Sequence, residues 1–206
     1  MKGKFITFEG SEGSGKSTHS RLLYDYLKSR GLDVIYIREP GGTKISEAIR
    51  GLLLDCKNED MAPEAEMLLY MAARAQLIAQ IIEPALKKGR IVLCDRFLDS
   101  TLAYQGYGLG INLKLIRDVG GFATRNTVPD LTIFLDLPAR EGLKACSRIK
   151  TKDRIEKRPI KFHLAVRSGY LKIARQEPKR FKIIKVEKDM RLTQKKVRIL
   201  AGRLIK

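Results

Sequence analysis

Residues 10–17 of this 206-residue chain have the spacing of a phosphate-binding loop, G-x-x-x-x-G-K-[ST]. Glycines allow backbone N–H groups to surround phosphate oxygens, and the N-terminus of a following helix adds positive potential. Lys16 can then reach the β- and γ-phosphates of a nucleotide, and Ser17 can hold Mg²⁺. A glycine-rich turn without a ligand is the alternative. Nucleotide binding is favoured because the loop follows an apolar run at residues 5–8 and precedes apolar residues at helical spacing, Leu22, Leu23, Tyr26 and Leu27.

Charged residues also follow two other apolar runs. Asp95 and Arg96 come after residues 91–94, and Arg38 comes after residues 34–37. Asp95 has the position of the acidic residue of a Walker B-type strand and can bind Mg²⁺ directly or through water; capping of the next helix is the alternative. Each guanidinium can hold a phosphate through paired N–H groups. Two arginines opposite a phosphate-binding loop indicate a second phosphorylated ligand and favour phosphoryl transfer over nucleotide binding alone.

A parallel sheet would bring these residues together. Short apolar, β-branched segments with helical periodicity between them recur at residues 5–8, 34–37, 91–94, 131–135 and 181–186. This alternation predicts an α/β fold of the P-loop NTPase kind, with three α/β/α layers and a five-stranded parallel sheet whose ligands bind at the carboxyl ends of the strands. We expect a single domain over residues 1–206, a helix over about 63–88, and a short charged lid at about 148–160.

The composition limits the function classes. The net charge of +18 is concentrated in residues 144–206, which carry 22 basic and 5 acidic side chains. Such a segment attracts nucleotides or nucleic acid, and a solvated lysine-rich surface is the alternative. The three cysteines and two histidines fit neither a disulfide framework nor a histidine-based metal centre. No apolar stretch approaches the roughly 20 residues of a membrane span, so we expect a cytoplasmic protein with no membrane contact.

The predicted lid could complete a phosphoryl-transfer site. Such transfer depends on positioning and on charge neutralisation, so further cations are expected around the migrating group. The lid contains Arg148, Lys152, Arg154 and Arg158, which could close over the nucleotide and exclude water. One of them could stabilise the transition state. For each of these residues taken singly, a solvent-facing charge on a helix is an equally good interpretation.

Several motifs together resemble one family. Phe8-Glu9-Gly10 before the loop is followed by residues 38–43, Asp95-Arg96 with Ser100 and residues 103–106, and then by residues 129–131 and 153–156. This combination, in this order over nearly the whole chain, is similar to that of bacterial thymidylate kinases. The resemblance implies transfer of the γ-phosphate of ATP to dTMP, giving dTDP, with Mg²⁺ and in a homodimer. It does not require nucleic acid.

The resemblance also implies the site residues. Those expected to bind ATP are Gly10, Ser11, Glu12, Gly13, Ser14, Gly15, Lys16, Ser17, Thr18 and Arg148. Those expected to bind dTMP are Glu9, Arg38, Pro40, Tyr70, Arg74, Arg96, Ser100, Thr101, Tyr104 and Gln105. Ser17, Asp95 and Glu9 are the expected metal ligands, and the expected catalytic residues are Lys16, Arg96 and Arg154.

Individual roles follow from the same resemblance. Tyr70 is expected to stack on the base, Arg74 to donate to thymine O4, and Tyr104 to lie under the sugar where it would exclude a ribonucleotide; core packing is the alternative for both tyrosines. Some family members carry a basic residue in the P-loop, whereas others use a lid arginine. This P-loop carries Glu12 and the lid carries Arg154, so the chain resembles the lid-arginine type.

This chain departs from the family pattern at three positions, Ala73, Phe97 and Leu109. The family commonly has an arginine at the position of Leu109, so this chain has one cation fewer near the phosphate of the acceptor. The main rival interpretation is another P-loop kinase, acting on dUMP, dCMP or a ribonucleotide. A P-loop ATPase that binds nucleic acid through the basic last third is a further alternative, and a GTPase is disfavoured because the Asn-Lys-x-Asp motif is missing.

Overall fold

The computed structural model describes residues 3–146 and 153–205. Five strands form one all-parallel sheet in the order β2-β3-β1-β4-β5. They are β1 (Lys4–Glu9), β2 (Val34–Arg38), β3 (Ile91–Asp95), β4 (Leu131–Asp136) and β5 (Phe181–Lys185). Each strand coincides with one of the apolar segments, because strands of a parallel sheet are buried on both faces and consist of nearly continuous apolar residues. The predicted five-stranded α/β fold is confirmed.

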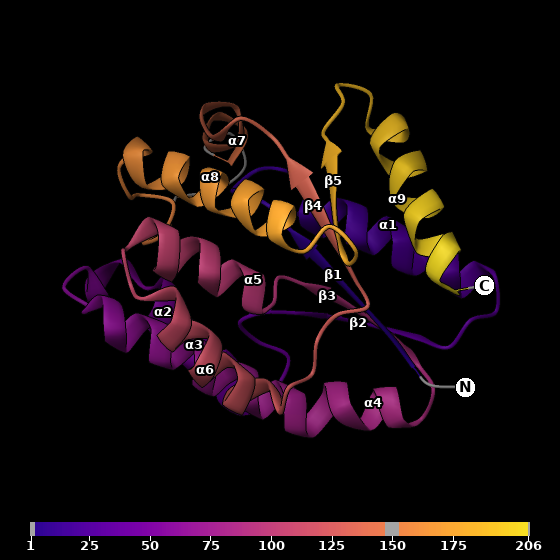
Figure 1. Cartoon of the computed structure of the whole chain (residues 1–206), viewed down its shortest axis with the longest axis horizontal. Coiled ribbons are helices and arrows are strands. Elements are labelled where there is room, and N and C mark those ends of the chain that lie inside the picture. Colours follow the sequence, from indigo (N-terminus) through magenta and orange to yellow (C-terminus); the bar gives the residue numbers. More distant parts are fainter. Residues whose placement is uncertain (1–2, 147–152, 206) are drawn as a thin grey trace.

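Helices flank both faces of this sheet (Figure 1). They are α1 (Lys16–Ser29), α2 (Lys44–Leu54), α3 (Pro63–Leu77), α4 (Glu83–Lys87), α5 (Leu98–Thr101), α6 (Leu113–Thr124), α7 (Ala139–Cys146), α8 (Ile160–Gln176) and α9 (Met190–Ile205). Apolar residues of α1 and α9 pack with β1, β3 and β4 in one buried cluster. Residues of α3, α6 and α8 form a second cluster against β4 and β5. The sheet is therefore covered on both sides and leaves its carboxyl edge for ligands.

The register of the sheet brings the predicted site residues to one edge. Phe8 of β1 and Arg38 of β2 both pair with Asp95 of β3. The loop that follows β1 passes directly into α1, which begins after Gly15 at φ 81°. A glycine adopts this left-handed conformation without strain. The P-loop, Arg38 and Asp95 therefore converge at the carboxyl edge, where open α/β sheets bind their ligands.

The helix predicted over residues 63–88 is present but not uniform. It consists of α3, a π-helical stretch (Ile78–Ile82) and α4. Pro84 lacks an N–H donor and cannot bond to the preceding turn, and the helix widens just before it. A second π-helical stretch, Leu102–Gly108, follows α5 and carries two predicted site residues, Tyr104 and Gln105.

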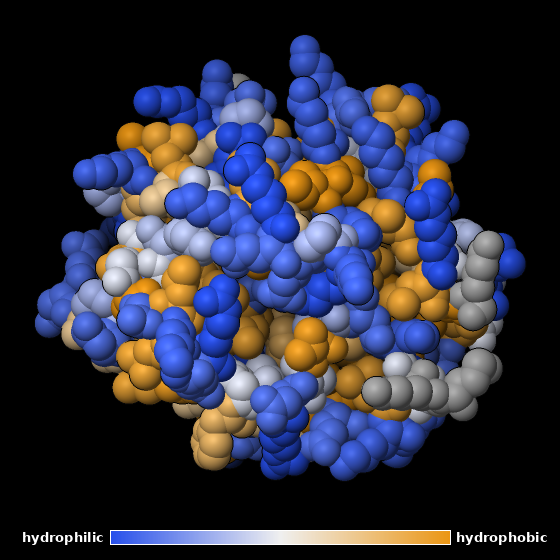
Figure 2. Space-filling model, viewed as in Figure 1, coloured by the Kyte–Doolittle hydropathy of each residue, from blue (hydrophilic) through white to orange (hydrophobic). Residues whose placement is uncertain are grey.

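The surface is largely polar. Figure 2 shows hydrophilic side chains over most of one face, with hydrophobic patches between them. Across residues 3–146 and 153–205, the structure contains no helix with the length and apolar character needed to cross a membrane.

Candidate active site

A cavity of about 350 Å³ opens at the carboxyl edge of the sheet. Its walls contain both predicted halves of the site. The donor half is formed by Glu12, Gly13, Gly15, Lys16, Ser17, Thr18 and Asp95. The acceptor half is formed by Arg38, Pro40, Tyr70, Arg96, Ser100, Thr101, Tyr104 and Gln105. A single cavity therefore combines a phosphate-binding loop with a second group of cations and aromatic side chains.

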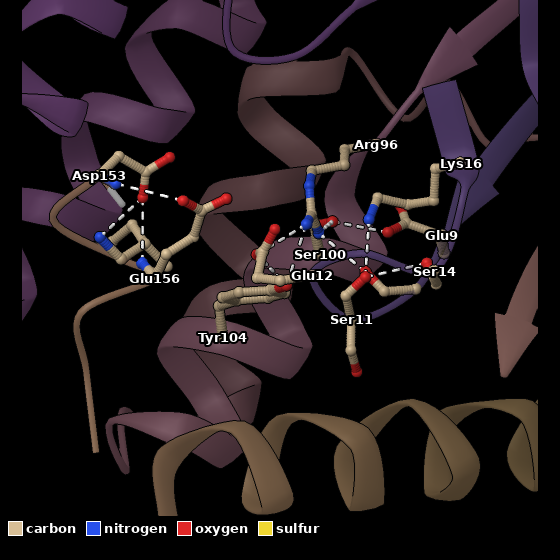
Figure 3. Close-up of polar contacts among 12 residues, drawn as sticks. Glu9, Ser11, Glu12, Ser14, Lys16, Arg96, Ser100, Tyr104, Asp153 and Glu156 are labelled. Carbon is tan, nitrogen blue, oxygen red and sulfur yellow. Dashed lines mark hydrogen bonds and ion pairs between the residues drawn. The ribbon is translucent and has the colours of Figure 1, made fainter. Parts of the chain in front are cut away.

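The P-loop is held in shape by its own polar groups. Lys16 Nζ and Ser14 Oγ each donate to the carbonyl oxygen of Ser11, both at 2.9 Å (Figure 3). Burial lowers the pKa of Lys16, and the neighbouring Arg96 lowers it further. The carboxylates of Glu12, Asp95 and Glu9 act in the opposite direction and favour the charged ammonium. A nucleotide phosphate beside Lys16 would favour the charged form further.

The P-loop also packs directly on α7. A Cβ on Gly142 would lie 2.0 Å from the carbonyl oxygen of Glu12, and a Cβ on Gly13 would lie 2.1 Å from that of Gly142. Neither position has room for a larger residue. This contact supports the loop from behind.

Ser17 and Asp95 form the candidate magnesium site. The Ser17 hydroxyl donates to Asp95 Oδ2 in a very short contact, and both residues line the cavity. A hydroxyl and a carboxylate are the oxygen ligands that Mg²⁺ takes beside nucleotide phosphates, with water completing the octahedron. Within the described residues, no group of three or more His, Cys, Asp or Glu side chains could hold a metal without other ligands. The donor set fits a metal held jointly by protein and nucleotide.

Arg96 is the centre of the acceptor half. Its guanidinium donates to Gly10 O and Ser100 Oγ at 3.2 Å, and it pairs with Glu12 at 2.9 Å (Figure 3). Tyr104 donates to the same Glu12 oxygen at 2.6 Å. Burial alone would raise the pKa of Glu12, but Arg96, Lys16 and the Tyr104 hydroxyl together lower it to about 2. Glu12 was expected to bind ATP, and in this structure it links the P-loop to the acceptor side.

Glu9 has partners other than those expected of a metal ligand. Its Oε1 accepts from Phe97 N at 2.8 Å, and its Oε2 accepts from Ser100 Oγ at 2.6 Å and from Tyr170 OH at 2.8 Å. Burial, followed by the charge of Asp99, raises its pKa to about 7. Among the described residues Glu9 does not line the cavity. The structure therefore gives Glu9 the role of fixing the segment that follows β3.

Arg74 also lies behind the cavity wall. Its Nε pairs with Glu39 Oε2 at 2.8 Å, and other N–H groups donate to Thr101 Oγ1 and Phe97 O, each at 3.1 Å. Only 1% of Arg74 is exposed, and it is not one of the described residues that line the cavity. In this structure Arg74 therefore contacts protein groups, because buried Glu39 requires a cation, and its contact with the base stays a prediction. Arg74 instead fixes Thr101.

Arg154 is likewise held away from the P-loop. Its Nε donates to Leu53 O at 2.8 Å, and its Nη2 lies 2.5 Å from Glu66 Oε2. Arg158 Nη2 contacts the same Glu66 oxygen at 2.7 Å. In this structure a buried carboxylate neutralises the charge of Arg154, and its catalytic role stays a prediction. Arg148, the lid residue that is predicted to bind ATP, lies outside the described residues.

Sequence reasoning missed two buried acids, Glu39 and Glu66. Glu39 directly follows the predicted site residue Arg38. Glu66 lies on α3, four residues before Tyr70 and eight before Arg74. Residues four apart share a helix face. This spacing was the available signal that Glu66 lies on the same face as two predicted site residues.

The arrangement defines a class. The site combines a P-loop with a second set of phosphate-binding cations at the carboxyl edge of a parallel sheet. This combination is typical of a kinase whose acceptor is a small phosphorylated molecule. The sequence profile of the family described as thymidylate kinase matches residues 8–197. The chain therefore belongs to the thymidylate kinase family, and it is an ATP-dependent nucleoside monophosphate kinase.

Individual relatives agree with this assignment. The thymidylate kinase of Pelotomaculum thermopropionicum is 47% identical over 93% of this chain and 89% of its own length. That of Thermoanaerobacter sp. (strain X514) is 44% identical over 92% of this chain and 96% of its own length. The crystal structure of thymidylate kinase from Ehrlichia chaffeensis matches with a TM-score of 0.80 at 34% identity, covering 98% of this chain and 99% of that one.

Proposed function

We propose that this protein transfers the γ-phosphate of ATP to dTMP, giving dTDP and ADP, in the cytoplasm and without nucleic acid. One observation carries the proposal: a single cavity contains Lys16 and Ser17 of the P-loop together with Arg38, Arg96 and Tyr70. Two phosphorylated ligands bound there would meet end to end, and such positioning supplies much of the rate of phosphoryl transfer.

The donor half binds the ATP phosphates. Backbone N–H groups of the P-loop and the N-terminus of α1 receive them, and Lys16 leaves Ser11 O to contact the β- and γ-phosphates. Ser17 and Asp95 would hold Mg²⁺, which neutralises charge on these phosphates when bound. Lys16 and Arg96 both line the cavity and can stabilise charge on the migrating group.

The acceptor half binds the nucleoside monophosphate. Arg38 and Arg96 hold its phosphate. The Arg38 side chain is 42% exposed and is therefore accessible to a ligand. Tyr70 stacks on the base. Thr101 and Gln105 face the edge of the base. Arg74 lies behind Thr101, to which it donates at 3.1 Å, and has to turn from this contact to donate to thymine O4. Tyr104 lies under the sugar and disfavours a 2′-hydroxyl.

Arg154 requires a conformational change to act on the transferred phosphoryl group. Its guanidinium is paired with Glu66 and is 4% exposed. A transition-state role therefore requires the arginine to leave this buried carboxylate. Lys16 and Arg96 already line the cavity, and we assign catalysis to them first.

An assay of ADP release over a panel of dTMP, dUMP, dCMP, AMP and GMP tests the proposal. We expect dTMP to have the highest kcat/KM. A better rate with any other acceptor refutes the substrate assignment. Activity that requires added Mg²⁺ and disappears with a chelator would support the metal, whereas activity in excess chelator would refute it.

We also propose a homodimer. Large apolar side chains on α2, α3 and α6 are exposed: Leu52, Leu68, Leu115 and Phe122. Phe122 is 87% exposed. The three helices pack side by side, as α2 on α3 and α3 on α6. An exposed apolar surface of this kind is typical of a subunit interface. Sedimentation should give a dimer for the wild type and a monomer for Phe122→Glu; an unchanged sedimentation coefficient would exclude this face.

A further inference from the structure

Glu66 lies at the centre of a buried cluster that the proposed reaction does not explain. Its Oε1 accepts from Gln105 Nε2 at 2.9 Å. Its Oε2 contacts Arg158 Nη2 at 2.7 Å and Arg154 Nη2 at 2.5 Å. We call these four residues the Glu66 cluster. One carboxylate therefore joins a residue of the acceptor half to two residues of the segment before α8.

The Glu66 cluster carries more positive than negative charge. A single carboxylate faces two guanidinium groups, although Glu66 is 0% and Arg154 is 4% exposed. The two arginines share one oxygen, while the amide of Gln105 occupies the other. Arg158 Nη1 is buried and has no hydrogen-bond partner within the described chain. Both guanidinium groups would be better paired if each had an oxygen of its own.

The Glu66 cluster reaches two parts of the cavity wall. Gln105 lines the acceptor half, whereas Asp153, Ile155 and Glu156 line the cavity from the segment that contains both arginines. Figure 3 shows Asp153 and Glu156 on one side of Glu12 and Lys16 on the other. Asp153 N donates to Glu156 Oε2 at 3.2 Å, and Asp153 Oδ1 accepts from Glu156 N at 3.0 Å. The segment is thus a folded turn, and a shift of its arginines would move its cavity-lining residues with them.

The geometry points to Glu66 as a positioning residue that couples acceptor binding to donor binding. A base that takes the amide of Gln105 releases Oε1 of Glu66. Arg154 and Arg158 can then each bind one oxygen, which fixes the turn at residues 153–158 in the form that receives the donor. This inference rests on the proposed function, because it takes the ligand of Gln105 to be the acceptor base. Coupling of this kind is reciprocal, so each ligand tightens the binding of the other.

Calorimetry on the full chain measures the coupling directly. The dissociation constant of a non-hydrolysable ATP analogue is determined with and without saturating dTMP. In the wild type we expect dTMP to tighten the analogue by about 5-fold or more. Arg158→Gln leaves one arginine for one carboxylate, so the protein should fold and the coupling should fall to within about 2-fold of none.

Two further variants separate the cluster from a general effect on α3. Glu66→Gln should also abolish the coupling, provided that a thermal melt shows a folded protein. Glu64→Gln changes an exposed acid on the same helix and should keep the coupling of the wild type. If Glu66 were merely structural, its replacement would change stability and leave the ratio of the two dissociation constants unaltered.

The inference is overturned if the wild type shows no coupling, or if a folded Arg158→Gln protein keeps it. Failure of the proposed function appears elsewhere, as a missing turnover of dTMP in the acceptor panel. In that event the same calorimetry is carried out with whichever acceptor turns over best. The ratio of dissociation constants then decides the role of Glu66 independently of the acceptor's identity.

Discussion

Replacement of Glu9 by Gln should make the protein more stable than the wild type at pH 8. Glu9 is fully buried, and its pKa is raised from 4.5 to about 7, chiefly by burial and then by the charge of Asp99. Its contacts suit an amide as well. The carbonyl oxygen of Gln can accept from Phe97 N, and its NH₂ group can donate to the hydroxyls of Ser100 and Tyr170.

The sign and size of the effect follow from proton linkage. Between pH 4.5 and pH 7 the folded wild type holds a proton on Glu9 that the unfolded chain has released. Stability is therefore lost as the pH rises through this window, and the loss is complete above the folded pKa. A difference from 4.5 to about 7 corresponds to about 3 kcal/mol as an upper limit. Gln has no proton to lose and escapes this penalty.

Urea unfolding from pH 4.5 to pH 8.5 in the presence of a chelator measures the difference. The free energies of unfolding of wild type and Glu9→Gln should be similar at pH 4.5 and should diverge by up to about 3 kcal/mol at pH 8. Because other groups also titrate, only the difference between the two proteins is used. Glu64→Gln, at an exposed position, is the matched control. Parallel curves for wild type and Glu9→Gln would refute the reasoning.

Further substitutions test the two halves of the cavity. Lys16→Met should lower kcat about 100- to 1,000-fold while the calorimetric Kd of dTMP stays nearly unchanged, because the ammonium acts on the transferring phosphates; a lowered dTMP affinity would contradict this. Gly142→Ala should raise KM for ATP and lower Tm, since its Cβ would lie 2.0 Å from the Glu12 carbonyl oxygen. Tyr104→Phe should raise KM for dTMP without changing KM for ATP, because Arg96 loses a contact of 3.0 Å; equal changes in both would exclude an acceptor-side role. Arg154→Ala should reduce the free energy of unfolding by about 2 kcal/mol, because buried contacts are lost. A large fall in kcat at unchanged stability would instead show that this arginine leaves its carboxylate during turnover.

The parts of the fold and site that the sequence predicts are those set by local pattern. Buried parallel strands require continuous apolar residues, and all five segments with that pattern are strands. The P-loop requires glycine where the backbone turns left-handed, as at Gly13 and Gly15, with φ 67° and 81°. Strand ends then place Arg38, Asp95 and Arg96 beside the loop, because a parallel sheet has one carboxyl edge.

The partners of the buried ions could not be predicted, because they are chosen across long stretches of chain. The sequence predicts a ligand contact for Arg74 and gives no sign of its partner Glu39, which is 35 residues away. Arg154, in the turn before α8, pairs with Glu66 of α3. A guanidinium has the same sequence signature whether it faces a substrate or a buried carboxylate. The three-dimensional distribution of acids decides between these outcomes, and local spacing does not contain it.

Some arginines of the basic last third take part in the same long-range pairing. Arg167 pairs with Asp136 at 2.7 Å, Arg180 pairs with Asp99 at 2.7 Å, and Arg154 pairs with Glu66. Each of these acids lies before residue 144, so charges that are segregated along the sequence are joined in space. Part of the positive excess is therefore an internal scaffold around β3, β4 and the acceptor half. Retention on immobilised DNA at physiological salt would show that the remaining surface cations bind polyanions, whereas elution in the flow-through would show that they do not.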